Sequence, residues 1–428
     1  MMYDQTRTDI FDTWVGQRSV AEPTSNIESK DLPFQSWRPF KEAFAPEIVH
    51  RAVSETEGSV GHLLDPFGGS GTSALTAQLL NVFPTTVEVN PYLADLIEAK
   101  LTQYSVQKLV DAAEALEADF LAPKMGRRPS LQGLPPTFVE PGVKGRFIFS
   151  LDLAKCLERL LRAINRIDDA KAQRLFRVLL STVAMEASNV RISGKGRRYR
   201  SNWNTRQTTG KEMSAAFFAK VHMAIRDIGR FSYRPQPRYD LRRGDARRVI
   251  LKPATQDVAV FSPPYPNSFD YTDVYNVELW LLGYLKKWSD NRTLRTSTLR
   301  SHVQVKRPYG LLVNASLTLE ATYHALCADR DALWSKDIPE MVSSYFKDMS
   351  KVMAIVGEAL RERGRVYCVV GDSQYAGHAI PVAQILKELA PSFGLVHIHS
   401  EQFRSMRASP QQGGRPELPE TMLVFRKP

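Results

Sequence analysis

The sequence contains little cysteine and no long apolar run. Its 428 residues include three cysteines, which lie far apart and form no Cys-x-x-Cys pair: Cys156, Cys327 and Cys368. This pattern argues against a disulfide framework or a zinc knuckle and is typical of a reducing compartment. The sequence contains no stretch of about 18 consecutive apolar residues, so we predict no membrane span. Residues 1–14 carry acidic side chains and lack the apolar segment of a signal peptide, so we expect a cytoplasmic protein.

Acidic side chains are also fewer than basic ones. There are 57 lysines and arginines against 46 aspartates and glutamates, which gives a net charge of +11 and a pI of about 9.4. Such a balance favours a polyanionic partner such as DNA, RNA or an acidic membrane surface, and a merely basic protein is the alternative. Hydrophobic residues make up 43% of the chain, enough for a sizeable core.

A glycine-rich turn follows an early strand signal. Residues 63–72 read LLDPFGGSGT, in which an apolar strand ends at Asp65, and SALTAQLLN continues as a helix. A strand, a glycine turn and a helix form the layout of nucleotide-type cofactor sites, because glycines let a ligand approach the backbone closely. The turn is not a Walker A loop, since no lysine follows the glycines, and it lacks the GxGxxG dinucleotide fingerprint.

An acidic residue ends the next predicted strand. Residues 85–91 read TTVEVNP, and Glu88 follows the glycines by about twenty residues, a position that suits an acceptor for ribose hydroxyls. An ordinary turn carboxylate is the alternative. The glycine turn and Glu88 together favour a nucleoside cofactor.

Two consecutive prolines end another apolar strand, at residues 258–261. The sequence continues as Ser262, Pro263, Pro264 and Tyr265. Prolines lack the backbone donor that a central strand needs, and they fix the directions of nearby carbonyls. A fixed carbonyl and the serine hydroxyl can each accept one hydrogen of an exocyclic amine, while the tyrosine ring stacks on the heterocycle. This predicts a site for a nucleobase taken out of its stack, with a proline-rich turn around a core tyrosine as the alternative.

Together, DPFGGSGT and SPPY resemble the S-adenosylmethionine-dependent amino-methyltransferases that act on nucleic acid. In that family an FxGxG motif binds the cofactor and a (D/N/S)PP(Y/F/W) motif holds the target amine; these are Phe67–Gly71 and Ser262–Tyr265 here. Other segments also resemble the family: PFKEAFAPEIVHRAV (39–53), VEVNP, GDAR (244–247), RGRVYCVVGDSQ (363–374) and PETMLVFRK (419–427). The resemblance leaves out about 101–235 and 286–335.

The resemblance implies a Rossmann-like α/β fold, with a seven-stranded, mostly parallel sheet and helices on both faces. It implies S-adenosylmethionine as cofactor and no metal. The implied cofactor-binding residues are Phe40, Lys41, Asp65, Phe67, Gly69, Gly71, Thr72, Glu88 and Asp245. The implied catalytic residues are Ser262, Pro263, Pro264 and Tyr265.

The chain is expected to divide into a catalytic domain with a long insertion. The catalytic domain comprises 31–105 and 236–428, after a polar and loosely ordered segment, 1–30. Apolar residues recur every three or four positions in LDLAKCLERLLRAI and AQRLFRVLLSTVAMEASNV, which predicts helices in an inserted, basic target-recognition region at 106–235. The basic stretch 286–335 is expected to contact DNA or to act as a lid.

The stretch from Ala187 to Lys211 has many bases, two aromatic residues and no acid. Arginine forks suit phosphates and guanine edges, and aromatic rings suit unstacked bases. We therefore predict nucleic-acid contact, with a solvated charged loop as the alternative. The predicted contact residues are Arg191, Lys195, Arg197, Arg198, Tyr199, Arg200, Trp203 and Arg206.

The serine of SPPY is seen most often in cytosine-N4 enzymes of the family, so the expected activity is N4-methylation of cytosine in double-stranded DNA. Adenine N6 and a guanine amine in RNA are alternative targets, and a catalytically inactive DNA-binding module and a protein-glutamine methyltransferase are further alternatives. No cysteine follows a proline, which argues against cytosine-C5 chemistry. His397 and His399 alternate along a predicted strand and are not expected to bind metal. The recognition sequence, the oligomeric state and a cognate restriction endonuclease stay open.

Overall fold

The computed structural model describes residues 5–40, 43–122, 133–193, 196–267, 269–407 and 417–428. Within these ranges the largest sheet has seven strands in the order β10-β11-β7-β6-β1-β2-β5. Their bounds are β1 His62–Asp65, β2 Phe83–Glu88, β5 Asp240–Arg243, β6 Gln256–Phe261, β7 Leu360–Gly371, β10 Val396–Arg407 and β11 Glu417–Arg426. Strands β5, β2, β1, β6 and β7 run parallel, and β11 runs antiparallel to both β7 and β10. The predicted fold class is confirmed.

The central strands are apolar on both sides because each face of the sheet carries a core. Leu63 of β1 and Val258 of β6 belong to one apolar cluster, while their neighbours Leu64 and Ala259 belong to a second. This alternation is the period-two geometry of a strand, and burial of both faces explains the continuous apolar runs. The helices therefore lie on both faces, as the resemblance implies.

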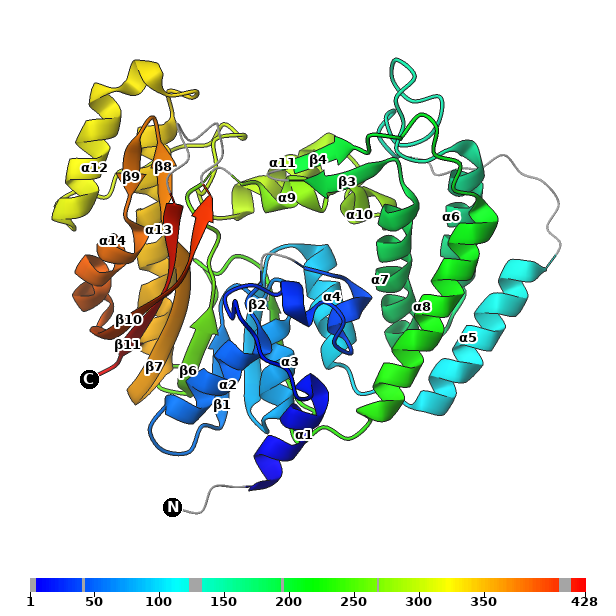
Figure 1. The fold of residues 1–428 in the computed structure, drawn as a ribbon, viewed down its shortest axis with the longest axis horizontal. Helices are drawn as coiled ribbons and strands as arrows, with labels where there is room; N and C mark the ends of the chain where they lie inside the picture. The colour runs from blue at the N-terminus through cyan, green and yellow to red at the C-terminus, as the bar shows by residue number, and fades with distance from the viewer. Residues whose placement is uncertain (1–4, 41–42, 123–132, 194–195, 268, 408–416) are drawn as a thin grey trace.

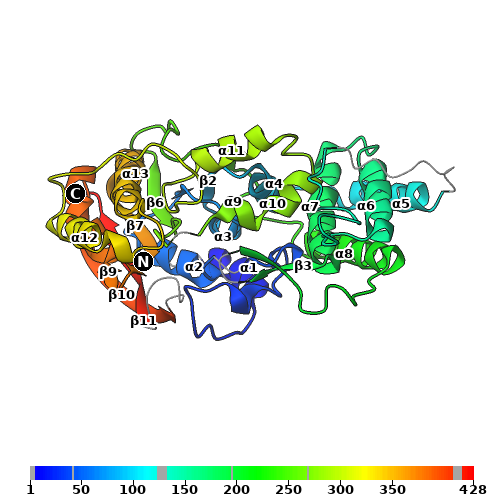
Figure 2. The same cartoon turned by 90° about the horizontal axis from the view of Figure 1, so that it is seen from above.

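The first face is covered by helices from the N-terminal half, α2 Pro46–Glu55, α3 Thr72–Leu79 and α4 Pro91–Leu101. The second is covered by α13 Ile338–Ala359 and α14 Val382–Leu389. The remaining C-terminal elements are α12 Leu317–Ala328, the hairpin of β8 Ser373–Tyr375 and β9 His378–Ile380, and the 3-10 helices η3 Arg330–Ala332 and η4 Ala390–Phe393. Figures 1 and 2 place α12 at one end of the molecule.

Four long helices pack together at the other end (Figures 1 and 2). They are α5 Val106–Leu121, α6 Leu151–Ile164, α7 Ala170–Ala187 and α8 Gly210–Arg230, and a hairpin of β3 Val190–Ser193 and β4 Gly196–Tyr199 follows α7. These elements come from the range 106–235, for which the sequence predicts an inserted helical region. Its status as a separate target-recognition domain stays a prediction.

The polar N-terminal segment includes a helix, α1, Gln5–Val15. Phe11 and Trp14 are each 3% exposed, and the Trp14 indole donates to the carbonyl oxygen of Pro33 at 3.0 Å. Residues three apart lie on one face of a helix, so these two aromatic rings anchor a segment whose average composition is polar. The 3-10 helices η1 Ile27–Ser29 and η2 Gln35–Trp37 continue the chain towards α2.

Three short helices follow the SPPY strand. They are α9 Tyr271–Val274, α10 Asn276–Leu281 and α11 Trp288–Ser297. Trp280, Leu281 and Leu282 are buried, as expected for core residues. In the part of the chain that the structure describes, no helix is long and apolar enough to cross a membrane.

Candidate active site

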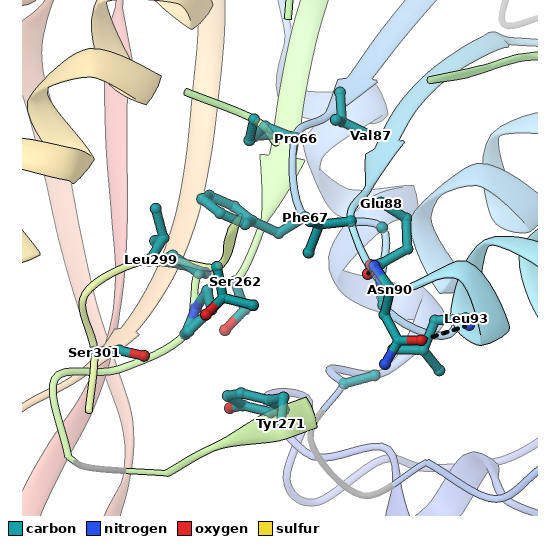
Figure 3. A pocket seen from close by; sticks show the side chains of 18 of the residues that line it. Pro66, Phe67, Val87, Glu88, Asn90, Leu93, Ser262, Tyr271, Leu299 and Ser301 are labelled. Carbon is teal, nitrogen blue, oxygen red and sulfur yellow. Dashed lines mark hydrogen bonds between the residues drawn. The ribbon is translucent and has the colours of Figure 1, made fainter. Parts of the chain in front are cut away.

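A cavity of about 330 Å³ opens at the carboxyl ends of β1, β2 and β6. Ligands of open parallel sheets bind at this edge. Figure 3 shows Phe67, Glu88 and Asn90 entering from one side and Ser262, Leu299 and Ser301 from the other. The glycine turn, the acidic strand end and SPPY, which lie far apart in the sequence, therefore line one cavity.

The glycine turn takes a shape that other residues would resist. Gly69 and Gly71 have φ angles of +52° and +80°, in the left-handed region that favours glycine. A Cβ atom at Gly68 would lie 2.5 Å from the Thr86 hydroxyl oxygen, because the turn packs directly on β2. This packing brings the backbone of the turn to the cavity wall.

Glu88 connects the turn to the end of β2. Its carboxylate accepts hydrogen bonds from the backbone amides of Gly69, at 2.8 Å, and Asn90, at 2.7 Å. Burial raises the pKa of Glu88 to about 7, against the opposing effect of these two amides. Asp65, at the end of β1, accepts from the Phe67 amide at 2.9 Å, and burial raises its pKa to about 6. Two buried carboxyl groups thus flank the turn.

A buried lysine supports the same turn from behind. The Lys100 ammonium donates to the carbonyl oxygen of Ser70 at 2.8 Å and to the Gln35 side chain at 2.9 Å. Gln35 in turn donates to the Thr72 hydroxyl at 3.2 Å. Burial lowers the pKa of Lys100 to about 7. No local pattern indicates this support, because Gln35 and Lys100 lie outside both motifs.

Asp245 and Phe40 complete the predicted cofactor wall. Asp245 lines the cavity, and its carboxylate is bound by the Arg247 guanidinium at 2.7 and 2.8 Å. Arg247 also donates to Asp348 at 2.7 Å, so Asp245 is held against α13. The Phe40 ring lines the cavity and stacks on Tyr275 at 5.8 Å between centroids. Lys41 lies outside the described residues.

The SPPY turn begins directly after β6, and all four of its residues line the cavity. The Ser262 hydroxyl lies 3.2 Å from the Tyr265 hydroxyl, which donates to Glu420 of β11 at 2.9 Å. The Tyr375 hydroxyl donates to the carbonyl oxygen of Pro266 at 2.9 Å and so fixes the end of the turn. Sequence reasoning missed the partnership with Glu420, although PETMLVFRK resembles the closing strand of the family.

The stretch after α11 forms another wall of the cavity, which includes Leu299, Ser301 and His302. His302 is 1% exposed, and neither ring nitrogen makes a hydrogen bond of good geometry among the described residues, although the side chains of Gln304 and Asp270 interact with it and raise its pKa. Burial lowers the pKa of His302 to about 4, against the effect of Asp270, whose Oδ1 lies 3.9 Å from Nε2. Asp270 caps α9 and pairs with Arg295 at 2.5 Å. Sequence reasoning missed His302.

The predicted nucleic-acid residues lie on the β3–β4 hairpin and the loop after it. Arg191 and Arg198 pair across the hairpin and are exposed. Tyr199 packs on Trp203 at 5.3 Å between ring centroids. Arg197 is half-buried, and Lys195 lies outside the described residues. Strand β4 contacts α9, which places the hairpin next to the helix that follows SPPY (Figure 1).

Two arginines of the predicted set have partners within the protein. Arg200 donates to the Ser188 carbonyl oxygen at 2.9 Å, and Arg206 donates to the Glu186 carbonyl oxygen at 2.7 Å. These carbonyls lie at the end of α7, where helix carbonyls lack intrahelical partners. Both guanidinium groups therefore cap a helix, and any contact with nucleic acid would use what remains of their donors.

Comparisons with known proteins give relatives over nearly the whole chain. No family model matches. Type II methyltransferase M.BsoBI of Geobacillus stearothermophilus is 24% identical over 458 residues, covering 94% of this chain and 87% of that protein. Type II methyltransferase M.AvaI of Nostoc sp. is 24% identical over 443 residues, covering 94% of this chain and 88% of that protein.

Among solved structures, an rRNA methyltransferase, AviRa, from Streptomyces viridochromogenes is 11% identical and has a TM-score of 0.31, covering 100% of this chain and 94% of that one. The [4+2]-cyclase SpnF is 9% identical with a TM-score of 0.32, covering 99% of this chain and 93% of that one. These overlaps are too low to carry an argument about function.

Proposed function

Since the chain is a relative of the type II methyltransferases over 94% of its length, we propose that it is an S-adenosylmethionine-dependent DNA methyltransferase. We propose further that it methylates the exocyclic N4 amine of cytosine at a specific site in double-stranded DNA. One observation carries the proposal: the glycine turn with Glu88 and the SPPY turn line the same cavity. A cofactor pocket and an amine-holding turn must meet if a methyl group is to pass between them.

The residues around the glycine turn fit S-adenosylmethionine. The cavity of about 330 Å³ lies within the range of small-molecule sites. Glu88 offers carboxylate oxygens to ribose hydroxyls, and Gly69, which has no Cβ atom, lines the cavity where a ligand would approach. A Cβ atom at Gly71 would instead lie 3.1 Å from Ile97 of α4, so this glycine allows the turn to pack on that helix. The cavity wall beside the glycine turn also includes two apolar rings and a carboxylate, those of Phe40, Phe67 and Asp245. The cofactor, when bound, supplies a methyl group on a sulfonium sulfur.

The SPPY turn would hold and orient the target amine. The lone pair of an exocyclic amine is delocalised into the ring, so the nitrogen is a poor nucleophile. The Ser262 hydroxyl and the Pro263 carbonyl would accept its two hydrogens and favour a pyramidal nitrogen. Methyl transfer forms a nitrogen–carbon bond and breaks the sulfur–carbon bond. A serine is too weak a base to take the proton first, so the proton passes to water after transfer, and most of the rate comes from positioning.

A flipped base would find aromatic surface beside this turn. Tyr265, Phe269 and Tyr271 line the cavity, and the last two rings lie 4.5 Å apart in an edge-on arrangement. Stacking on aromatic rings returns part of the few kcal/mol that removal of a base from the helix requires. Basic residues of the β3–β4 hairpin, next to α9, would contact the DNA that surrounds the base.

The choice of cytosine rests on the serine of SPPY. Adenine N6 is the second candidate target, because the same acceptor pair would serve either amine. An RNA guanine amine is the third, and it is less favoured because the relatives that span nearly the whole chain are type II methyltransferases.

The deciding experiment measures modified nucleosides. The protein would be expressed in a host that lacks amino-methylation, and the genomic DNA digested and analysed by mass spectrometry. We expect N4-methylcytosine, lost in Ser262→Ala but kept in Ser392→Ala, a control at an exposed serine of η4. N6-methyladenine instead would overturn the choice of base and keep the mechanism. The proposed function would be overturned if the wild type left every DNA tested unmethylated and Ser262→Ala gave the same result.

A further inference from the structure

Glu420 lines the active-site cavity from a strand that carries neither motif. It lies on β11, opposite Gly371 of β7, and its side chain is buried, with the residue 3% exposed. Its carboxylate accepts a hydrogen bond from the Tyr265 hydroxyl at 2.9 Å. The same hydroxyl lies 3.2 Å from the Ser262 oxygen. The three residues form a chain from the C-terminal strand to the side chain expected to hold the target amine.

The directions of the hydrogen bonds in this chain follow from the number of hydrogens. The Tyr265 hydroxyl donates to Glu420, and a tyrosine hydroxyl has only one hydrogen to donate. Burial, with a further contribution from Glu420, raises the pKa of Tyr265 well above its usual range, so that hydrogen stays in place. Since it points to Glu420, the contact between Tyr265 and Ser262 is donated by the serine. The serine hydrogen is then turned away from the amine, and its lone pairs are left to accept.

We infer that Glu420 is a positioning residue that sets the direction of this chain and so presents Ser262 to the target amine as an acceptor. Without Glu420, the tyrosine hydrogen could point to Ser262, and the serine hydrogen could then face the hydrogens of the amine. The inference rests on the proposed function. It goes beyond the SPPY motif, because the family pattern accepts Phe or Trp at the fourth position and so requires no hydroxyl there.

The test is a double-mutant cycle on methyl transfer. Glu420→Gln keeps the shape but adds an amide donor that allows the chain to reverse, and Tyr265→Phe keeps the ring and removes the hydroxyl. Each is expected to lower kcat about tenfold, the size of a net hydrogen bond of about 1.4 kcal/mol, with KM for cofactor and DNA within about twofold of the wild type. If Glu420 affects methyl transfer through the tyrosine hydroxyl, the double variant is expected to match Tyr265→Phe alone.

Two results would overturn the inference while leaving the proposed function in place. One is a folded Glu420→Gln variant with the kcat of the wild type. The other is a double variant whose loss is the product of the two single losses, since Glu420 would then act independently of the hydroxyl. Should Glu420→Gln fail to fold, Tyr265→Phe decides alone: an unchanged kcat overturns the chain and a tenfold loss supports it. A wild-type enzyme that methylates no DNA would overturn both the function and this inference.

Discussion

The carboxylate of Glu88 accepts a hydrogen bond from the backbone amide of Gly69 at 2.8 Å. This bond joins the end of β2 to the glycine turn after β1, across 19 residues of sequence. The two features that predicted a nucleoside cofactor are thus parts of one structure. Glu88 also accepts from the Asn90 amide, and Asn90 caps α4, so the same carboxylate fixes the start of the next helix.

Replacement of Glu88 should weaken cofactor binding. In Glu88→Gln the new amide group must face the amide of either Gly69 or Asn90, and one charged acceptor for the ribose is lost. Hydrogen bonds to charged groups contribute about 1.5–3 kcal/mol, which predicts roughly 10- to 100-fold weaker binding of S-adenosylmethionine at a pH above the Glu88 pKa of about 7. Isothermal titration calorimetry would measure it, with Glu114→Gln as an exposed control on α5. Unchanged affinity would remove Glu88 from the cofactor site.

The raised pKa of Glu88 should also appear in the pH dependence of stability. The folded protein keeps a proton on Glu88 up to a pKa of about 7, whereas a free glutamate releases it near 4.5. Between these values the folded state binds more protons than the unfolded state, so the free energy of unfolding falls as pH rises. The glutamine side chain of the Glu88→Gln variant does not titrate.

The stability advantage of the wild type over Glu88→Gln should therefore shrink from about pH 5 to about pH 8. Denaturant unfolding of the free protein at several pH values would measure the difference between the two. A constant difference across this range would mean that Glu88 has no raised pKa.

The sequence predicted those parts of the site that local patterns encode. Strand, glycine turn and helix around Phe67, and strand followed by prolines at Ser262, are contiguous, and parallel strand ends meet at one edge of the sheet. Glu420 and Lys100 could not be found in this way. Each acts on a residue far away in the chain, Tyr265 and Ser70 respectively, and such contacts depend on how strands and helices pack.

In the basic stretch from Ala187 to Lys211, by contrast, composition alone did not show which arginines are available to DNA. Its composition predicted a set of DNA-contacting arginines, but Arg200 and Arg206 donate to carbonyls at the end of α7. A sequence shows the charge of a side chain and not its neighbours. Arg191 and Arg198, which are exposed on the hairpin, remain as the stronger predictions for phosphate contact.

Replacement of Arg198 should therefore weaken DNA binding, whereas replacement of Arg200 should lower stability. Arg198→Ala should weaken DNA binding, reduce the slope of log affinity against log salt by about 0.9, and leave thermal stability unchanged. Arg200→Ala should lower the free energy of unfolding by about 1–3 kcal/mol, because the Ser188 and Met185 carbonyls lose a charged donor. Fluorescence anisotropy over a salt series and denaturant unfolding would measure the two effects. Equal loss of stability in both variants would contradict this division.

Replacement of His302 should stabilise the protein, whereas replacement of an ordinary core residue destabilises it. Neither of its buried ring nitrogens makes a hydrogen bond of good geometry among the described residues, and its pKa of about 4 keeps it neutral near pH 7. Replacement of a poorly satisfied buried polar group by an apolar one removes a desolvation penalty, so His302→Leu should raise the free energy of unfolding by about 1 kcal/mol. The same change should lower DNA methylation, because His302 lines the cavity beside SPPY and its nitrogens are available to a bound base. Denaturant unfolding and steady-state methylation of one preparation would measure both effects, with His324→Leu on α12 as a control outside the cavity. A variant that loses stability, or that gains it without any loss of methylation, would show that His302 serves packing alone.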